Sequence, residues 1–311
     1  MKKRGYLLAL LSALQLLSAA LYLGAAEQPG FPLDDAWIHQ TYARNLGLHG
    51  LMAFSPEQPS TGSTSPGWTT LLAAGYVLKA PLFDWAYIWG SIFGIAAAFT
   101  AARLSHSYFG DSKRAMIVAV VCILEWHLAW ATLSGMEISL FTFLSLLILL
   151  ALYHNTSPFL MGLLIGLTFL IRPEGIIFAL LYGMKLLFTN RVDLRRFLIK
   201  VGAFAGIFLL VIGPWILFNL VYNGRPFPST ISSKFMQYGY PWSLWNSFAY
   251  LVKVSIYFIN GPLMLLIPGV VVALYDTFRK RRTELYDPVA WSSILIGLYA
   301  VALPAIYHHG R

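Results

Sequence analysis

Two adjacent aspartates stand out in a chain that has few charged residues. Asp34 and Asp35 occur in the segment PGFPLDDAWIHQTYARNL, shortly after an apolar stretch long enough to cross a membrane. A carboxylate in this place can act as a general base toward a hydroxyl group. Aspartate also favours helix starts, and Ile38, Tyr42 and Leu46 give the following helix an apolar stripe. One aspartate is enough for a cap, so the second needs a partner, a cation or a chemical role.

Further acidic residues lie in short polar motifs between apolar segments. Glu137 belongs to SGME, where Ser134 and Glu137 have the spacing of a capping box, so a local capping role and a role in a site both stay open. Arg172 and Glu174 belong to RPEG. Their charges can pair across the turn as a weak surface ion pair, or they can line a site.

Cationic side chains end two other polar segments. Lys234 closes NGRPFPSTISSK, and His308, His309 and Arg311 lie in the terminal HHGR. A lysine at a membrane interface commonly extends its ammonium group to water and does nothing more, whereas its functional alternative is to neutralise a leaving phosphate. Tandem histidines can ligate a metal, but no third ligand lies near them in the sequence. We therefore predict no metal site, although a divalent cation at the substrate stays open.

The composition is that of a membrane protein. Of the 311 residues, 58% are hydrophobic and 11% are charged, and the mean hydropathy is +0.66. The sequence has one cysteine, Cys122, which excludes an intrachain disulfide and a cysteine-based metal site. The formal charge of +9 is concentrated in short loops between apolar segments. This distribution sets membrane topology, so we expect no nucleic-acid partner.

Apolar segments predict an all-α polytopic membrane protein with about nine transmembrane helices. The predicted ranges are 6–23, 84–103, 114–132, 138–153, 158–171, 175–188, 201–222, 261–275 and 288–307. The first segment follows three basic residues, Lys2, Lys3 and Arg4. Its length favours a transmembrane span that is not cleaved over a cleaved secretory signal. Glu125 and His127 lie inside the third segment, where a functional role and a buried pairing both stay open.

The basic residues predict a cytoplasmic N-terminus, because most of the 22 lysine and arginine residues then lie in cytoplasmic loops. The polar motifs fall on the outer face, where the two long loops are 24–83 and 223–260. Each contains a short apolar segment, 68–79 or 250–258, that we expect to lie along the membrane as an interfacial helix. If 68–79 crossed the membrane instead, everything after it would have the opposite orientation.

The order of these features resembles the GT-C superfamily of membrane glycosyltransferases. The motifs DDAWIHQTYARNL, STGSTSPGW, SGME, RPEG and HHGR are most similar to the branch that contains cell-wall arabinofuranosyltransferases. The resemblance covers nearly the whole chain and implies that 1–311 is one GT-C-like transmembrane module. It also implies an inverting transfer of a sugar from a polyprenyl-phosphate donor to a hydroxyl group of a glycan, lipid or protein acceptor.

The resemblance further implies roles for individual residues. Asp35 or Asp34 would be the catalytic base, and Glu137 would line the same cavity. We favour Asp35 as the base because Asp34, next to Leu33, makes the better helix cap. Lys234 would contact the donor phosphate directly. The residues expected near that phosphate are Arg172, His308, His309 and Arg311.

The length of the chain departs from this family, whose members usually continue through further spans. The sequence is therefore expected to be a fragment or a minimal version, which leaves acceptor binding open. The alternative function is a transporter or flippase of a lipid-linked glycan. Transporters bind their substrates near the middle of the bilayer, often between inverted repeats, and the sequence has no visible repeat. We therefore favour a glycosyltransferase of the cell membrane with a periplasmic or extracellular active site.

Overall fold

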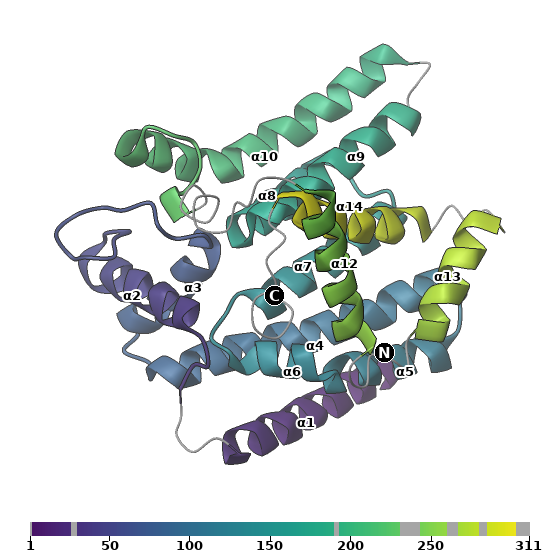
Figure 1. Cartoon of the computed structure of the whole chain (residues 1–311), viewed down its shortest axis with the longest axis horizontal. Helices are drawn as coiled ribbons and strands as arrows, with labels where there is room; N and C mark the ends of the chain where they lie inside the picture. Colours follow the sequence, from purple (N-terminus) through teal and green to yellow (C-terminus); the bar gives the residue numbers. More distant parts are fainter. Residues whose placement is uncertain are drawn as a thin grey trace.

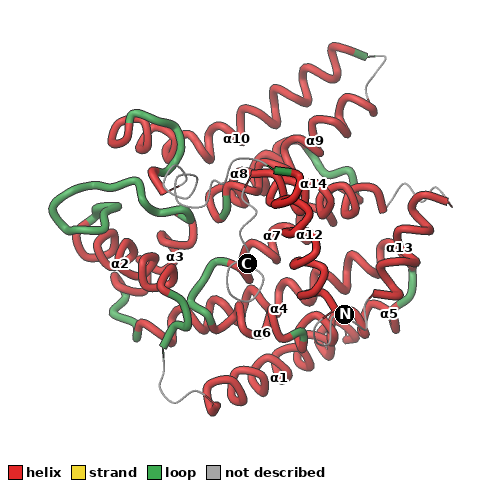
Figure 2. The backbone as a smooth tube through the Cα atoms, in the orientation of Figure 1, coloured by secondary structure: helices red, strands yellow, loops and turns green. Residues whose placement is uncertain are grey.

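The computed structural model describes residues 2–25, 30–189, 193–230, 243–259, 267–279 and 285–302. These residues are predominantly helical and contain no β-strand, apart from an isolated bridge between Ser55 and Gln58 (Figure 2). The helices are α1 (Lys2–Ala25), α2 (Asp34–His49), α3 (Pro66–Val77), α4 (Leu82–Phe109), α5 (Ser112–Leu124), α6 (Trp126–Leu133), α7 (Ile138–Tyr153), α8 (Pro158–Ile171), the 3₁₀ turn η1 (Pro173–Gly175), α9 (Ile176–Thr189), α10 (Leu194–Asn223), α12 (Leu244–Ile259), α13 (Ile267–Arg279) and α14 (Tyr286–Ala302). The predicted all-α class is confirmed for this part of the chain.

Three helices of the described residues are long and apolar enough to cross a membrane, namely α1, α4 and α10. The bent pair α5 and α6 makes a fourth if it is counted as one span. Helices α7 and α8 are also apolar, but they have 16 and 14 residues. At about 1.5 Å per residue they extend roughly 24 and 21 Å, less than the ~30 Å hydrocarbon core. The protein thus has three or four candidate spans in the described residues, and the predicted count of about nine is not confirmed.

The predicted segment 114–132 is not one straight helix, because the chain bends by 54° between α5 and α6. Glu125 lies at the break with an extended backbone, and its carboxylate accepts the backbone N–H of Leu128 at 2.9 Å. The same side chain lies 2.5 Å from Nδ1 of His127. Glu125 therefore caps α6 and pairs with His127, which explains why a carboxylate and an imidazole occur in an apolar segment.

Several helix ends meet at one end of the bundle, which we call the far end. The hydroxyl of Tyr153, at the end of α7, donates to the carbonyl oxygen of Ser107 near the end of α4 at 2.6 Å. Nζ of Lys185, near the end of α9, donates to the carbonyl oxygen of Leu152. It also lies 3.4 Å from Oδ2 of Asp287 in the first turn of α14. The ends of α7 and α9 thus lie beside the start of α14, and the end of α4 lies beside the end of α7.

The polar motifs lie at the opposite end, which we call the site end. Nε1 of Trp68 donates to the carbonyl oxygen of Gly135 at 3.0 Å, joining STGSTSPGW to SGME. Gly135 has φ +74°, and a Cβ there would come within 2.4 Å of the Phe31 ring. The backbone N–H of Ser229 donates to the carbonyl oxygen of Thr61 at 3.2 Å, so the two predicted outer loops touch. Figure 1 shows α2 and α3 on the same side of the molecule as the C-terminal end of α10.

Aromatic packing holds the segment before the aspartates. The Phe31 ring lies 5.4, 5.1 and 5.8 Å from the rings of Trp37, Phe83 and Tyr87, respectively, in edge-on contacts. Phe83 and Tyr87 belong to the first turns of α4. Edge-on aromatic pairs add to the energy of burial and fix ring positions. The start of α2 is therefore anchored to the start of α4.

The predicted interfacial segment 68–79 largely coincides with α3. Trp68 and Leu72 are buried in the protein, whereas Val77 and Leu78, at the C-terminal end, are exposed. The helix has 12 residues, or roughly 18 Å, which is too short for a crossing. The second predicted interfacial segment, 250–258, lies within the longer helix α12.

Candidate functional site

Helix α2 begins with the aspartate pair. Leu33 occupies the N-cap position, and Oδ1 of Asp34 accepts the backbone N–H of Asp35 at 3.0 Å. The prediction that Asp34 itself is the N-cap is therefore wrong by one residue, although its carboxylate does serve the first turn of the helix. Asp34 is exposed and Asp35 is half-buried. Both carboxylates also lie at the positive end of the helix dipole, where a negative charge is stabilised.

His39 connects this helix to the interior of the site. It follows Asp35 by four residues, a spacing that makes the two side chains neighbours on one face of α2. The imidazole is buried, and its Nε2 lies 3.3 Å from Oε2 of Glu137. Its Nδ1 is buried without a hydrogen-bond partner among the described residues. His39 therefore links the helix that carries the aspartates to a buried carboxylate.

Glu137 is in turn paired with Arg172. Oε1 of Glu137 lies 3.1 Å from Nη1 of Arg172, and only 5% of the Glu137 side chain is exposed. Nη2 of Arg172 lies 3.0 Å from Oε1 of Glu174 and donates to the Tyr299 hydroxyl at 3.3 Å. The Tyr299 hydroxyl donates to Glu174. The centre of the Phe141 ring is 5.7 Å from Cζ of Arg172, which is a cation–π contact.

We call His39, Glu137, Arg172, Glu174 and Tyr299 the Arg172 cluster. They come from α2, the turn before α7, the end of α8, η1 and α14. Local sequence explains the turn at Arg172 that follows α8. A residue before a proline favours an extended backbone, and Arg172 precedes Pro173. Its backbone is extended, with φ −150° and ψ 133°. Helix α8 must end there, which turns the guanidinium toward Glu137.

The capping-box interpretation of Glu137 is wrong. Ser134 is the C-cap of α6, and its hydroxyl donates to the carbonyl oxygen of Ala131 at 2.9 Å. Helix α7 starts at Ile138 without a side-chain cap. The Glu137 carboxylate contacts Arg172 and His39, because a charge-assisted pair is stronger than a bond to a neutral backbone group.

The pairing of Arg172 with Glu174 is confirmed, but it is not an isolated surface pair. The exposed fractions of these side chains are 26% and 16%, respectively. The same guanidinium also pairs with the buried Glu137. The surface-pair interpretation therefore missed that Arg172 joins two turns of the chain.

Electrostatics keeps both carboxylates of the Arg172 cluster ionised. Burial alone would raise the pKa of Glu137, but the hydrogen bond and charge of His39, together with the charge of Arg172, lower it from 4.5 to about 2. Burial also opposes ionisation of Glu174, and the charge and hydrogen bond of Arg172 outweigh it, so its pKa is lowered. Two carboxylates share one guanidinium, so Arg172 has no positive charge to spare.

Some of the predicted site residues lie close together in the structure, and others lie outside the residues that it describes. Glu137 and Arg172 are in contact at the site end, and His39 joins them to α2, the helix whose first turn contains Asp35. The predicted phosphate ligands Lys234, His308, His309 and Arg311 lie outside the described residues. Within the described ranges, no group of three or more histidine, cysteine, aspartate or glutamate side chains could hold a metal ion.

Sequence reasoning missed His39 and Tyr299 as members of the site. The i+4 spacing from Asp35 was a usable signal for His39. Tyr299 is 127 residues from Arg172 and lies in an apolar helix, so no local pattern indicated it. Comparisons with protein-family models, curated proteins and solved structures give no match for this chain. We therefore infer its function from the residues of the site and their surroundings.

Proposed function

We propose that this chain is a membrane glycosyltransferase that moves a sugar from a polyprenyl-phosphate donor to an acceptor hydroxyl of the cell envelope. The observation that carries the proposal is the contact between His39 and Glu137, at 3.3 Å. It ties the helix that begins with two aspartates to a buried ionic cluster. This helix follows α1, which is long and apolar enough to cross a membrane. A lipid-borne donor and a water-borne acceptor would meet at such a boundary.

In the proposed reaction, the acceptor oxygen attacks the anomeric carbon while its proton moves to the carboxylate of Asp35. The bond between the anomeric carbon and the phosphate oxygen breaks, and its electron pair leaves with polyprenyl phosphate. Attack from the face opposite the phosphate inverts the anomeric configuration. Asp35 suits the role of base better than Asp34, because Asp35 is half-buried on the face of α2 that carries His39, whereas Asp34 is exposed.

We assign the Arg172 cluster a positioning role. The guanidinium is shared by Glu137 and Glu174, so Arg172 would lie near the donor phosphate as a fixed charge and not as its main ligand. Lys234 is the proposed direct ligand of the leaving phosphate, with His308, His309 and Arg311 nearby. Support comes from the bond between Ser229 and Thr61, because it brings the segment that leads to Lys234 to the first outer loop.

The proposed setting is a GT-C-like bundle of about nine spans in the cell membrane, with a cytoplasmic N-terminus and a periplasmic or extracellular site. Support comes from exposed basic residues in the first turns of α5 and α10, namely Lys113, Arg114, Arg195 and Arg196. Helices α7, α8 and α9 run between the two ends, although each is shorter than a typical span.

The test is product formation by the purified full chain in detergent. The donor would be a radiolabelled polyprenyl-phosphate sugar, with arabinofuranose tried first, and the acceptor a cell-envelope glycan fraction. Label transferred to the glycan, with release of polyprenyl phosphate, is the expected result. A transporter has no membrane to cross in detergent and would give no product. Donor movement across reconstituted vesicles without any transfer would therefore replace this proposal with the transporter alternative.

A further inference from the structure

Helices α2 and α3 end side by side, and apolar side chains are uncovered at both ends. A Cβ on Gly47, in the last turn of α2, would come within 2.8 Å of Cβ of Tyr76 in the last turn of α3. A residue without a side chain at this position thus lets the two helix ends touch. Next to this contact along the chain, Leu48, Val77 and Leu78 are exposed by 57%, 64% and 66%, respectively. We call these three residues the apolar patch.

Two exposed cations, Arg44 and Lys79, accompany the apolar patch. Arg44 precedes Leu48 by four residues, which puts both side chains on one side of α2. Burial raises the pKa of Tyr76 and the charge of Arg44 lowers it, so the guanidinium lies near the last turn of α3. Lys79 directly follows Leu78.

The local balance of charge is positive. Neither cation lies within 4.0 Å of a carboxylate oxygen among the described residues. The acidic residue nearest to Lys79 along the chain is Asp84, in the first turn of α4. Two cations and one carboxylate leave a net positive charge, which favours a partner with anionic groups.

The connection to α4 brings the apolar patch close to the bilayer. Helix α4, a candidate membrane span, begins at Leu82, three residues after Lys79. A chain covers at most about 3.6 Å per residue, so Lys79 lies within roughly 11 Å of Leu82. Nε1 of Trp85 donates to the carbonyl oxygen of Leu71 at 3.0 Å, which fixes the first turn of α4 to α3. A span begins at the boundary between the hydrocarbon core and the headgroups. The bilayer is therefore a better partner for the patch than a soluble protein is.

The burial of α3 determines how the contact with the bilayer is made. Trp68 and Leu72 are buried in the protein, so α3 does not have a long apolar face to lay along the membrane. Its end remains available, together with the end of α2. Interfacial contacts combine burial of apolar side chains with electrostatic attraction to anionic lipids. The apolar patch and the two cations supply both parts.

We propose that the ends of α2 and α3 insert into the headgroup region of the leaflet at the site end and bind anionic phospholipids there. The apolar patch lies against the upper part of the acyl chains, and Arg44 and Lys79 contact the lipid phosphates. This contact would hold α2, whose first turn contains Asp35, at a fixed height relative to the bilayer. The inference depends on α4 as a membrane span and not on the proposed glycosyltransferase activity.

The test is fluorescence quenching in proteoliposomes that contain the full chain. In a background in which Cys122 is replaced by alanine, Leu78→Cys carries a dansyl label. The quencher is either phosphatidylglycerol or phosphatidylcholine with a nitroxide near the top of one acyl chain, at the same mole fraction. We expect both lipids to quench the label. Phosphatidylglycerol should quench it more, because each cation near the membrane surface enriches an anionic lipid about fivefold.

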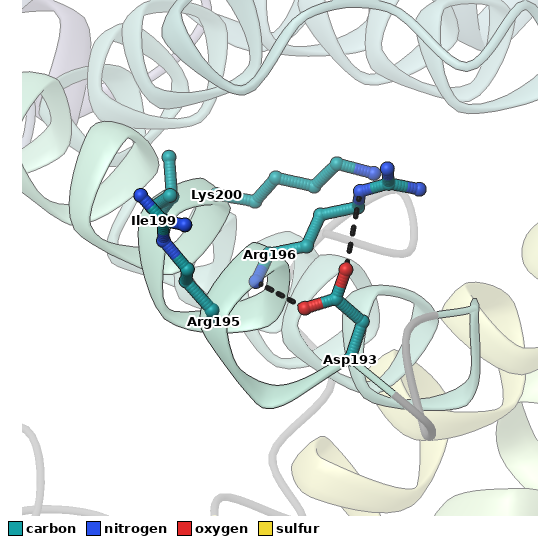
Figure 3. A pocket seen from close by; sticks show the side chains of 5 residues that line it. All are labelled: Asp193, Arg195, Arg196, Ile199 and Lys200. Atoms are coloured by element: carbon teal, nitrogen blue, oxygen red, sulfur yellow. Dashed lines mark hydrogen bonds and ion pairs between the residues drawn. The ribbon is translucent and has the colours of Figure 1, made fainter.

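Substitutions of the two cations test the lipid preference. Arg44→Gln and Lys79→Gln should each lower the enrichment of phosphatidylglycerol about fivefold and leave quenching by phosphatidylcholine unchanged. Arg195→Gln is the matched control. Arg195 is an exposed basic residue that lines a separate hollow at the start of α10, where Nε of Arg196 lies 3.5 Å from Oδ2 of Asp193 (Figure 3). This variant should give the same quenching as the wild type.

Absence of quenching by both lipids would overturn the membrane contact, since the labelled residue would then lie in water or against a protein. Equal quenching of the wild type by the two lipids would overturn the preference for anionic phospholipids. An equal loss in Arg195→Gln would indicate general attraction to a basic chain and would overturn the role of Arg44 and Lys79. None of these measurements needs sugar transfer, so failure of the proposed function would not change their outcome.

Discussion

Nη1 of Arg172 lies 3.1 Å from Oε1 of Glu137, although the two residues are 35 positions apart in the sequence. The pair joins the turn before α7 to the end of α8, and only 5% of the Glu137 side chain is exposed. Removing the Glu137 charge leaves Arg172 paired with Glu174 alone. The loss is then that of one buried, charge-assisted hydrogen bond, which contributes more than a surface pair does.

We expect Glu137→Gln to lower the free energy of unfolding by about 2 kcal/mol, the magnitude typical of a lost hydrogen bond between charged groups. Asp111→Asn is the matched control, because Asp111 pairs with Arg114 on the surface and asparagine can still cap α5. The control should change stability by less than about 1 kcal/mol. Thermal unfolding of both variants in the same detergent measures the difference. Equal effects would show that the pair with Arg172 adds nothing beyond a surface contact.

The pKa of Glu137 predicts an acid transition. Because it is lowered from 4.5 to about 2 in the folded chain, the ionised form stabilises the fold. This contribution is complete above about pH 4.5 and is lost as the pH falls through about 2. Glu174 has the same sign, so the wild type alone cannot separate them. The difference in melting temperature between the wild type and Glu137→Gln should therefore shrink from pH 5 toward pH 2, and a constant difference would contradict the assignment.

Asparagine substitutions separate helix capping from catalysis. Asparagine keeps the shape of aspartate and still serves a helix start, so Asp34→Asn and Asp35→Asn should both fold. If Asp35 is the base, its variant should lose about 10²–10⁴ in turnover, while Asp34→Asn should lose much less. Initial rates of sugar transfer and circular dichroism measure the two properties. Full activity in both variants would remove the aspartate pair from the proposed mechanism.

His39 offers a test of positioning. Glutamine can present an N–H to Glu137 near the place of Nε2, whereas alanine cannot. If His39 holds α2 through this contact, His39→Gln should retain most of the turnover and His39→Ala should lose most of it. His106→Ala, an exposed histidine near the end of α4, is the control and should be neutral. A glutamine variant as inactive as alanine, with an altered pH profile, would instead indicate that the ring exchanges a proton during the reaction.

Cysteine labelling tests the orientation of the chain. Glu57 and Lys113 are exposed and lie in the first predicted outer loop and in a predicted inner loop, respectively. In a background in which Cys122 is replaced by alanine, Glu57→Cys should react with an impermeant maleimide in intact cells. Lys113→Cys should react only after the membrane is permeabilised. The reverse pattern would place the aspartate pair on the cytoplasmic face and rule out an outer-face site.

The sequence alone determined the helical class and several element boundaries. The predicted segments 138–153 and 158–171 coincide with α7 and α8, and the helix predicted after the aspartates is α2. These features depend on neighbouring residues, such as runs of apolar side chains, the proline that ends α8 and the aspartates that open a helix. The sequence also indicated that the polar motifs belong together, because they alternate with apolar segments.

Only the tertiary structure decided which charged groups meet. Arg172 had a local partner in Glu174, but its contacts with Glu137 and Tyr299 require α7, α8 and α14 to pack at one end. The pairing of Glu137 with His39 likewise depends on how α2 is seated by Phe31 and Trp68. The bend at Glu125 could not be predicted for a related reason. A run of apolar residues indicates that a helix is buried, but it does not indicate whether the helix is straight. Partner choice among buried charges follows from the packing of distant elements, which no local pattern encodes.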